Sequence, residues 1–384
     1  MLPIYLSFKE MWRNQGRFLL FSLVIALITV LVLFIAALAD GLGNGNREYI
    51  EKLNADLIVY KSDVALSITA SQLGREKLLG VSRVPGVTDA GQVSFSSTVV
   101  RYQGAKELNV SLIGVGPGKP GEPPVVQGRG LQDRQAKEAI IDRNVALTTG
   151  LRVGDNLTIK SIQGAKEKLY TLKVVGISDG RQFFLQPSVI VPDLTFEQIK
   201  PGAVPTGNAS DLISNIIVVQ LQHPSQWKQM ESVLASQVSG IQAVDKVTAY
   251  ENTPGYAAQQ STLGTQQFFS LLIGVLVIGG FFQIQMLQKV PQIGMLKAVG
   301  ASSPVIALSA LAQIVMVTVI GVAIGTAATL LMALTFPATI PIVFSPMAIV
   351  LGVVSILLIG PLGGLVSIRY ALRVEPLTAL GLSS

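Results

Sequence analysis

Cysteine is absent from this chain of 384 residues, and histidine occurs only once, at position 223. The missing Cys excludes disulfides and thiolate metal sites. His223 lies in the turn-like segment QHPSQ, which favours a surface position over a role as a metal or haem ligand. No paired carboxylates and no Ser–His arrangement stand out in the sequence. We therefore predict that the chain carries no catalytic site, no metal site and no cofactor of its own.

A nucleotide site is also missing, although the segment GVGPGKPGEPP (114–124) is rich in glycine. Dinucleotide and Walker A motifs both need a helix that opens directly after the glycines, so that its N-terminus meets phosphate. The prolines of this segment prevent such a helix, and Lys119 is followed by Pro120 rather than by Ser or Thr. We interpret the segment as a stiff loop.

Charged residues are scarce: they make up 14% of the chain, whereas an average soluble domain has about a quarter. Four long apolar segments carry no Asp, Glu, Lys or Arg at all, namely 18–39, 263–287, 304–336 and 347–368. At about 1.5 Å per residue, about 20 helical residues cross a hydrocarbon core of roughly 30 Å. The sequence therefore predicts an α-helical membrane protein with four transmembrane helices.

Two of these segments allow a more detailed interpretation. The first resembles a secretory signal peptide, because Ala37-Leu38-Ala39 looks like a cleavage site. Its apolar run is longer than the usual about 7–15 residues, so we favour a transmembrane helix and keep cleavage as the alternative. In the third segment, Gly321 and Gly325 form a small-xxx-small pattern that permits close packing against another helix.

Residues 40–262 differ in texture from the rest of the chain. Charges of both signs, Gly, Pro and Asn return, and short β-rich runs alternate with turn signals. This pattern predicts a large extracytoplasmic mixed α/β domain, inserted between the first and second transmembrane helices. Within it we predict a β-rich subdomain at 138–197. A second lobe would combine 41–135 with 200–262, where a helix at 227–238 and a strand at 243–250 complete a strand–helix–strand unit.

Lys and Arg residues flank the apolar segments unevenly. Seven of them lie in 1–17, 288–303 and 369–384, and none lies in 337–346. Because cytoplasmic loops carry the excess of Lys and Arg, both termini and the 288–303 loop are predicted to be cytoplasmic. The sequence then predicts a multi-pass membrane protein with the large domain on the extracytoplasmic side. No basic stripe for a phosphate backbone is present, so nucleic acid is not a predicted partner.

The N-terminal residues 1–17 place apolar and basic side chains at helical spacing, which predicts an amphipathic helix on the cytoplasmic membrane surface. The alternative is a basic flank without a helix. Residues 369–384 form the predicted cytoplasmic tail.

This arrangement, one span, a large outer domain and then three spans, resembles the MacB/FtsX-like permeases, also called type VII ABC transporters. The segment 292–302, QIGMLKAVGAS, is similar to the cytosolic segment of that family. The C-terminal segment matches a second family pattern at Ala371, Pro376, Ala379 and Leu380. Within the family, the stretch ADLIVYKSDV (55–64) resembles HrtB-like and DevC-like permeases.

The resemblance implies how the protein works. A separate ATPase subunit would bind ATP and Mg, and this chain would supply the transmembrane helices as a multi-pass permease of the bacterial cytoplasmic (inner) membrane. The 288–303 loop would be the coupling loop, whose short helix is seated in a groove of the ATPase. The coupling residues implied by the resemblance are Ile293, Gly294, Met295, Lys297, Ala298, Val299, Gly300, Ala301, Glu375 and Pro376.

Two permease copies would match an ATPase dimer, giving a homodimer in a 2+2 complex, and a periplasmic adaptor is a further candidate partner. The expected function is export or extraction of a hydrophobic or amphiphilic substrate of the haem, lipid, peptide or drug class, by mechanotransmission. The absence of ionisable residues in the four segments argues against an ion-coupled transporter. The alternative function is an FtsX-like signal transducer that activates an extracellular hydrolase or sensor kinase. The substrate and its binding residues are not predicted.

Overall fold

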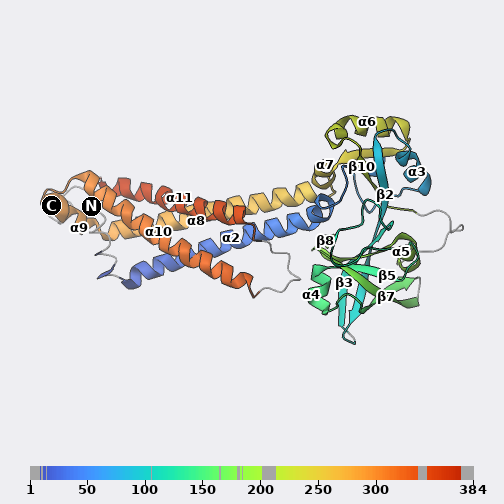
Figure 1. The fold of residues 1–384 in the computed structure, drawn as a ribbon. Helices are drawn as coiled ribbons and strands as arrows, with labels where there is room; N and C mark the ends of the chain where they lie inside the picture. The colour runs from blue at the N-terminus through green and yellow to red at the C-terminus, as the bar shows by residue number, and fades with distance from the viewer. Residues whose placement is uncertain are drawn as a thin grey trace. The chain divides into compact units, whose positions relative to one another are not determined.

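The chain forms two compact units, one made of residues 1–41 with 260–384 and the other of residues 42–259. The computed structural model describes residues 9, 12–13, 15–104, 106–163, 166–179, 182–183, 185–200, 213–335 and 344–372, without side chains at 44–46, 298 and 364–372. The first unit is helical and the second is built on a mixed β-sheet (Figure 1).

The helical unit contains five described helices. They are α2 (Gln15–Glu51), α8 (Tyr256–Gln288), α9 (Val290–Ala298), α10 (Ser303–Ala333) and α11 (Pro346–Leu372). Among the described residues, four of them (α2, α8, α10 and α11) are long and apolar enough to cross a membrane. The longest extensions past the predicted apolar segments are in α2, which continues to Glu51, and in α8, which begins at Tyr256; α11 also continues to Leu372.

Small residues bring these helices together. A Cβ placed on Gly321 of α10 would lie 2.7 Å from the Cβ of Ile25 in α2, and one on Gly325 would lie 2.6 Å from the carbonyl oxygen of Ala26. The close helix approach predicted from this glycine pair is therefore present. The crossing of α8 and α11 is made similarly, at Gly279 and Gly363. Apolar side chains fill the remaining interior and include Ile314, which is fully buried.

One lobe of the second unit has a β-α-β-β-α-β pattern. Its elements are β1 (Leu57–Lys61), α3 (Arg75–Ser82), β2 (Val87–Tyr102), β10 (Ile216–Leu221), α6 (Trp227–Gln237) and β11 (Ile241–Asp245). The strands lie in the order β11-β1-β10-β2, and each neighbouring pair is antiparallel. This is the ferredoxin-like arrangement, in which each helix connects two strands that are not adjacent. Buried residues from α3, α6 and the sheet share one core, with Leu234 and Val81 fully buried.

A second lobe is inserted between β2 and β10. It contains β3 (Lys106–Val115), β4 (Val125–Gly128), β5 (Glu138–Asp142), α4 (Arg143–Thr149), β6 (Asn156–Gln163), β7 (Lys166–Ser178), β8 (Gln182–Phe183), β9 (Gln186–Pro192) and α5 (Asp193–Ile199). The long strand β2 joins the lobes, because its first half pairs with β10 and its second half with β6. The hairpin β2–β3 packs into the core of this lobe through Val100, Val110 and Leu112, so the lobe extends beyond the predicted insertion 138–197.

The strand predicted at 243–250 ends early. β11 stops at Asp245, and the next residues form the helix α7 (Lys246–Glu251). The side chain of Asp245 accepts a hydrogen bond from the backbone N–H of Val247 at 2.9 Å, which caps the helix. This capping interaction turns the chain from strand to helix at that residue.

Candidate functional site

The candidate site is the short helix α9, which lies between α8 and α10. α8 ends at Gln288, and Lys289 keeps a helical backbone conformation before α9 begins at Val290. Pro291 falls in the first turn of α9, where a residue without a backbone N–H is tolerated. The chain therefore leaves one helix and starts the next with almost no loop between them.

The C-terminal end of α9 is a Schellman cap. The N–H of Gly300 donates to the carbonyl oxygen of Lys297 at 3.0 Å, and the N–H of Ala301 donates to that of Leu296 at 2.9 Å. Gly300 has a φ of +96°, in the left-handed region that favours glycine. The sequence motif Gly-Ala thus stops α9 and redirects the chain into α10.

One side of α9 faces the chain's own helices. Ile293 is only 5% exposed and belongs to an apolar cluster that includes Met286 of α8 and Ile306 of α10. Gly294 is also buried, and Ala301 packs against the same cluster. Ile293 therefore anchors α9 to the membrane helices of this chain.

The other side of α9 is open and apolar. Val299 is 85% exposed, Met295 59% and Leu296 47%. Lys297 is half-buried beside them. Leaving three large apolar side chains exposed on a nine-residue helix and its cap is unfavourable in water, so this face has the character of a contact surface. Of the other predicted coupling residues, Ala298 has no described side chain, and Glu375 and Pro376 lie outside the described residues.

Lys289 ties the start of α9 to two neighbouring helices, which the sequence did not predict. Its Nζ donates to Oε1 of Gln313 in α10 at 2.5 Å and lies 5.9 Å from the ring centroid of Phe18 in α2. Next to it, Arg17 of α2 donates a hydrogen bond to Gln288 of α8. The signal in the sequence was the placement of Gln313 within a long uncharged segment, where a polar side chain needs a partner.

In the second unit, the last turns of α2 are fixed by polar contacts. Glu48 accepts a hydrogen bond from Lys52 at 2.7 Å, and Lys52 also pairs with Asp179 at 3.4 Å. Lys246 of α7 donates to the carbonyl oxygens of Glu51 and Leu53, both at 3.2 Å. Because α2 starts in the helical unit and ends here, one continuous helix belongs to both units.

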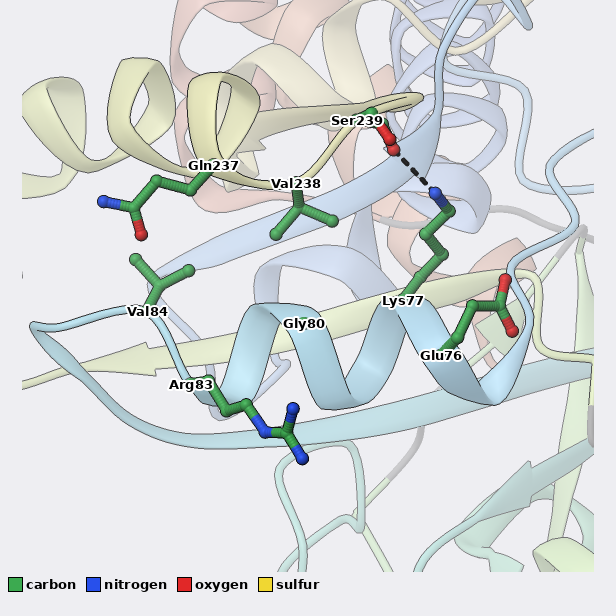
Figure 2. Close-up of a pocket in the computed structure, with 8 residues that line it drawn as sticks. All are labelled: Glu76, Lys77, Gly80, Arg83, Val84, Gln237, Val238 and Ser239. Carbon is green, nitrogen blue, oxygen red and sulfur yellow. Dashed lines mark hydrogen bonds between the residues drawn. The ribbon is translucent and has the colours of Figure 1, made fainter.

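A hollow in the second unit shows no catalytic arrangement among its described lining residues. It has a volume of about 370 Å³ and lies between α3 and the end of α6, where Lys77 donates to the carbonyl oxygen of Ser239 at 2.8 Å (Figure 2). Its lining combines both charge signs, from Glu76, Lys77 and Arg83, without a nucleophile beside a base. Among the described residues, no group of three or more His, Cys, Asp or Glu could hold a metal ion.

One buried carboxyl group has a strongly shifted pKa. Burial raises the pKa of Asp142 to about 7, although hydrogen bonds from the backbone N–H groups of Ser188 and Val145, each 2.8 Å long, favour the ionised form. These bonds join β5, α4 and β9. Asp142 therefore connects three elements of the second lobe, and its buried side chain is not accessible to a substrate.

Comparison with known families connects this architecture to a function. Residues 18–237 match the MacB-like periplasmic core domain, and residues 267–376 match the FtsX-like permease C-terminal domain. The chain belongs to the MacB/FtsX-like family of ABC transporter permeases. The resemblance found in the sequence is thereby confirmed, and the protein is a membrane protein with an extracytoplasmic domain.

Relatives of this MacB/FtsX-like permease align over nearly its whole length. A Staphylococcus haemolyticus protein named as the permease HrtB of a hemin transport system is 25% identical over 98% of this chain and 99% of its own. An uncharacterised ABC transporter permease of Mycobacterium tuberculosis is 24% identical over 96% of this chain and 97% of its own. Membership in this family implies a partner ATPase.

Two solved structures are similar to part of the permease. The alignment with the extracellular domain of the transporter YknZ from Gram-positive bacteria covers 49% of this chain and 99% of that domain, with 16% identity and a TM-score of 0.37. The alignment with the periplasmic region of MacB from Actinobacillus actinomycetemcomitans covers 52% of this chain and 92% of that region, with 14% identity and a TM-score of 0.35.

Proposed function

We propose that this permease exports or extracts a hydrophobic or amphiphilic compound, driven by a separate ATPase that holds α9 in a groove. Four helices (α2, α8, α10 and α11) cross the cytoplasmic membrane, with residues 40–262 outside between the first and second spans. Both termini and α9 are on the cytoplasmic side, where the flanking Lys and Arg residues favour them. Two copies of the chain match the two subunits of the ATPase.

The observation that carries this proposal is the division of α9 into two faces. Its inner face is anchored through Ile293 to the membrane helices, and its outer face exposes Met295, Leu296 and Val299. Such a helix can transmit a displacement, because a partner bound to the outer face also moves the membrane helices that contact the inner face. Lys289 adds a polar connection to α10, so displacement of α9 is not absorbed by a flexible loop.

The continuity of α2 supports mechanical transmission. The helix spans 37 residues, or roughly 55 Å at about 1.5 Å per residue, and belongs to both units. A movement of its cytoplasmic end is therefore passed along one helix to the outer domain. In this mechanism the substrate is handled at the outer leaflet or outside, and the chain needs no wide channel.

Transport is favoured over signalling by the names of the relatives. The S. haemolyticus relative is named for hemin transport, and it aligns with the chain from end to end. Hemin is a flat, largely apolar compound, which agrees with a substrate of the hydrophobic or amphiphilic class. No residue of this chain is assigned to substrate binding.

The test is co-purification with the ATPase encoded next to the permease. We compare the wild type with Val299→Glu, which places a charge on the C-cap residue of α9, the most exposed of the three apolar side chains on the outer face. The matched control is Val247→Glu, the same substitution at a half-exposed position of α7 in the outer domain. Gly300→Glu is less informative, because its φ of +96° would strain any side chain and disrupt the cap as well.

The expected result is loss of the ATPase with Val299→Glu and retention with Val247→Glu, both variants being present in membranes at wild-type level. Equal recovery of the ATPase with wild type and Val299→Glu would contradict the docking role of α9. If wild type itself recovers no ATPase, the coupling mechanism as a whole is wrong.

A further inference from the structure

A small hollow in the second unit is built like a ligand site, although the proposed coupling mechanism does not use it. It has a volume of about 180 Å³. Its lining comes from four strands and one loop and includes Thr69, Phe95, Ser96, Ser97, Phe183 and Gln186. None of the described residues that line it is charged, so it favours an uncharged occupant.

The floor of the hollow is aromatic. The rings of Phe95 (β2) and Phe183 (β8) are stacked, with centroids 4.2 Å apart and planes at 26°. Tyr49 from the end of α2 meets both rings edge-on, at 5.3 Å from Phe95 and 5.6 Å from Phe183. Phe183 is buried, whereas Phe95 is half-buried, which leaves part of its ring accessible from the hollow. Aromatic faces and edges of this kind favour the stacking of another ring.

The rim of the hollow is polar and held in place. Ser97 donates a hydrogen bond to Oε1 of Gln186 at 3.1 Å, and Ser111 fixes the floor by donating to the carbonyl oxygen of Phe183 at 2.8 Å. Hydroxyl and amide groups around an apolar floor are the usual composition of a small-molecule site, in which a few polar groups set the orientation. They suit a ring that carries a hydrogen-bonding substituent on its edge.

Backbone strain gathers beside the hollow. The loop that supplies Thr69 contains Ala65 at φ +49° and Leu66 at φ +54°, and Leu185, which lies between Phe183 and Gln186 in the chain, has φ +61°. Side-chain-bearing residues rarely adopt these conformations, and such strain concentrates at functional sites. The remainder of the described chain contains two other non-glycine residues with positive φ, Asp63 in the same loop and Gln103 in the turn after β2.

We propose that this hollow binds a small, uncharged aromatic compound that carries a hydroxyl or similar polar group. Its volume is below the roughly 300–1,000 Å³ of drug-sized pockets, so it holds one or two rings and excludes a macrocycle such as hemin. The hydroxyl and amide groups of its described lining offer hydrogen bonds to a neutral ligand and no counter-charge to a carboxylate. A bound ring would contact the same aromatic cluster that surrounds the end of α2.

The test exploits the absence of cysteine from the chain. Thr69→Cys places a single thiol on the exposed rim of the hollow and leaves the Ser97–Gln186 pair intact, in the full-length protein in lipid nanodiscs. Phenol is the probe, and the rate of thiol modification by a charged disulfide reagent is measured with and without it. Ser236→Cys, on the exposed surface of α6, is the matched control.

For a Kd of about 1 mM, phenol at about 10 mM occupies the site about 90% of the time and slows modification of the rim thiol about tenfold. The thiol of the Ser236→Cys control should react at an unchanged rate. Equal reactivity of the Thr69→Cys variant with and without phenol, or equal slowing of both variants, would overturn the proposal.

A second variant checks the role of the aromatic floor. Phe95→Leu removes the ring but keeps an apolar side chain of similar bulk, so the domain should remain folded. In the Thr69→Cys background, this change is expected to abolish most of the protection by phenol. Protection that remains tenfold would show that the ring of Phe95 does not form the site. Binding and release of the ATPase are not involved, so the outcome is independent of the proposed function.

Discussion

The contact between α2 and α10 is the packing feature most sensitive to a single methyl group. A Cβ on Gly325 would lie 2.6 Å from both the carbonyl oxygen of Ala26 and the Cβ of Thr29. Non-bonded carbon atoms normally approach to about 3.5–4.0 Å. The opposing atoms are backbone or close to it, so they cannot rotate away. Gly325→Ala therefore requires the two helices to separate by about 1 Å at this crossing.

The expected cost is that of an overpacked core, about 1–3 kcal/mol of unfolding free energy. Gly321→Ala should cost a similar amount, because its Cβ would lie 2.7 Å from the Cβ of Ile25. The double variant should cost less than the sum of the two, since the helices have already separated for the first methyl group. Gly280→Ala on α8 is the matched control, because nothing among the described residues lies within 4 Å of its Cβ position.

The assay is unfolding of the purified protein in mixed micelles by increasing SDS, followed by far-UV circular dichroism. Gly325→Ala and Gly321→Ala should shift the transition to lower SDS. Gly280→Ala should leave it unchanged or move it slightly upwards, because Ala is a better helix former by about 0.8–1 kcal/mol. If Gly325→Ala and Gly280→Ala behave alike, the close contact of α2 and α10 does not stabilise the bundle.

Four further predictions concern buried or capping residues. Burial raises the pKa of Asp142 to about 7 from 3.8, so between these pH values the folded state keeps a proton that the unfolded state has lost. The free energy of unfolding should therefore fall by up to about 1.4 kcal/mol per pH unit in this range and level off above it. Asp142→Asn should flatten this pH dependence, as urea titrations at several pH values would show. Gln285 is 1% exposed and its amide has no hydrogen-bond partner among the described residues. Gln285→Leu should therefore stabilise the helical unit by about 1–3 kcal/mol in the SDS assay. A loss of stability in this variant would contradict the prediction and indicate that the amide has a partner. Gly300→Ala should destabilise by about 1 kcal/mol or more through its positive φ, whereas Val299→Ala should have little effect, as thermal unfolding would show. Asp245→Ala should cost about 0.5–2 kcal/mol by removing the cap of α7, measured by urea unfolding.

The apolar segments of the membrane helices were predictable from the sequence, because an uncharged run of more than about 18 residues indicates a transmembrane helix. Their ends were not readable from hydropathy alone. α2 continues through residues 40–51, where charged side chains make the helix water-soluble, and ion pairs one turn apart support it. Arg47 bonds to Glu51 at 3.0 Å, and Lys52 to Glu48 at 2.7 Å. The charge spacing contains this signal, although a search for apolar runs passes over it.

The candidate site was predictable as a motif and not as a surface. The family resemblance identified the segment 292–302, and the structure shows that Gly300 and Ala301 within it end α9 through capping bonds. The division of α9 into an anchored face and an open face depends on side chains contributed by α8 and α10. Ile293 and Val299 are both apolar, and only the folded arrangement shows that one is buried and the other exposed. The link from Lys289 to Gln313 joins residues on two helices, which spacing within one helix does not reveal.

α2 connects these observations. In the helical unit it is held closely against α10 by the glycine pair, and in the second unit its last turns are bonded to α7 and to the segment after β7. If α2 moves as one body during coupling, the α2–α10 contact is the place where sliding must occur for the spans to shift. At positions 321 and 325, α10 has no side chain that would obstruct Ile25 and Thr29 of α2 as the helices slide. The small residues at this crossing therefore serve movement as well as close packing, and Gly325→Ala should impair ATP-driven function more than its stability cost alone explains.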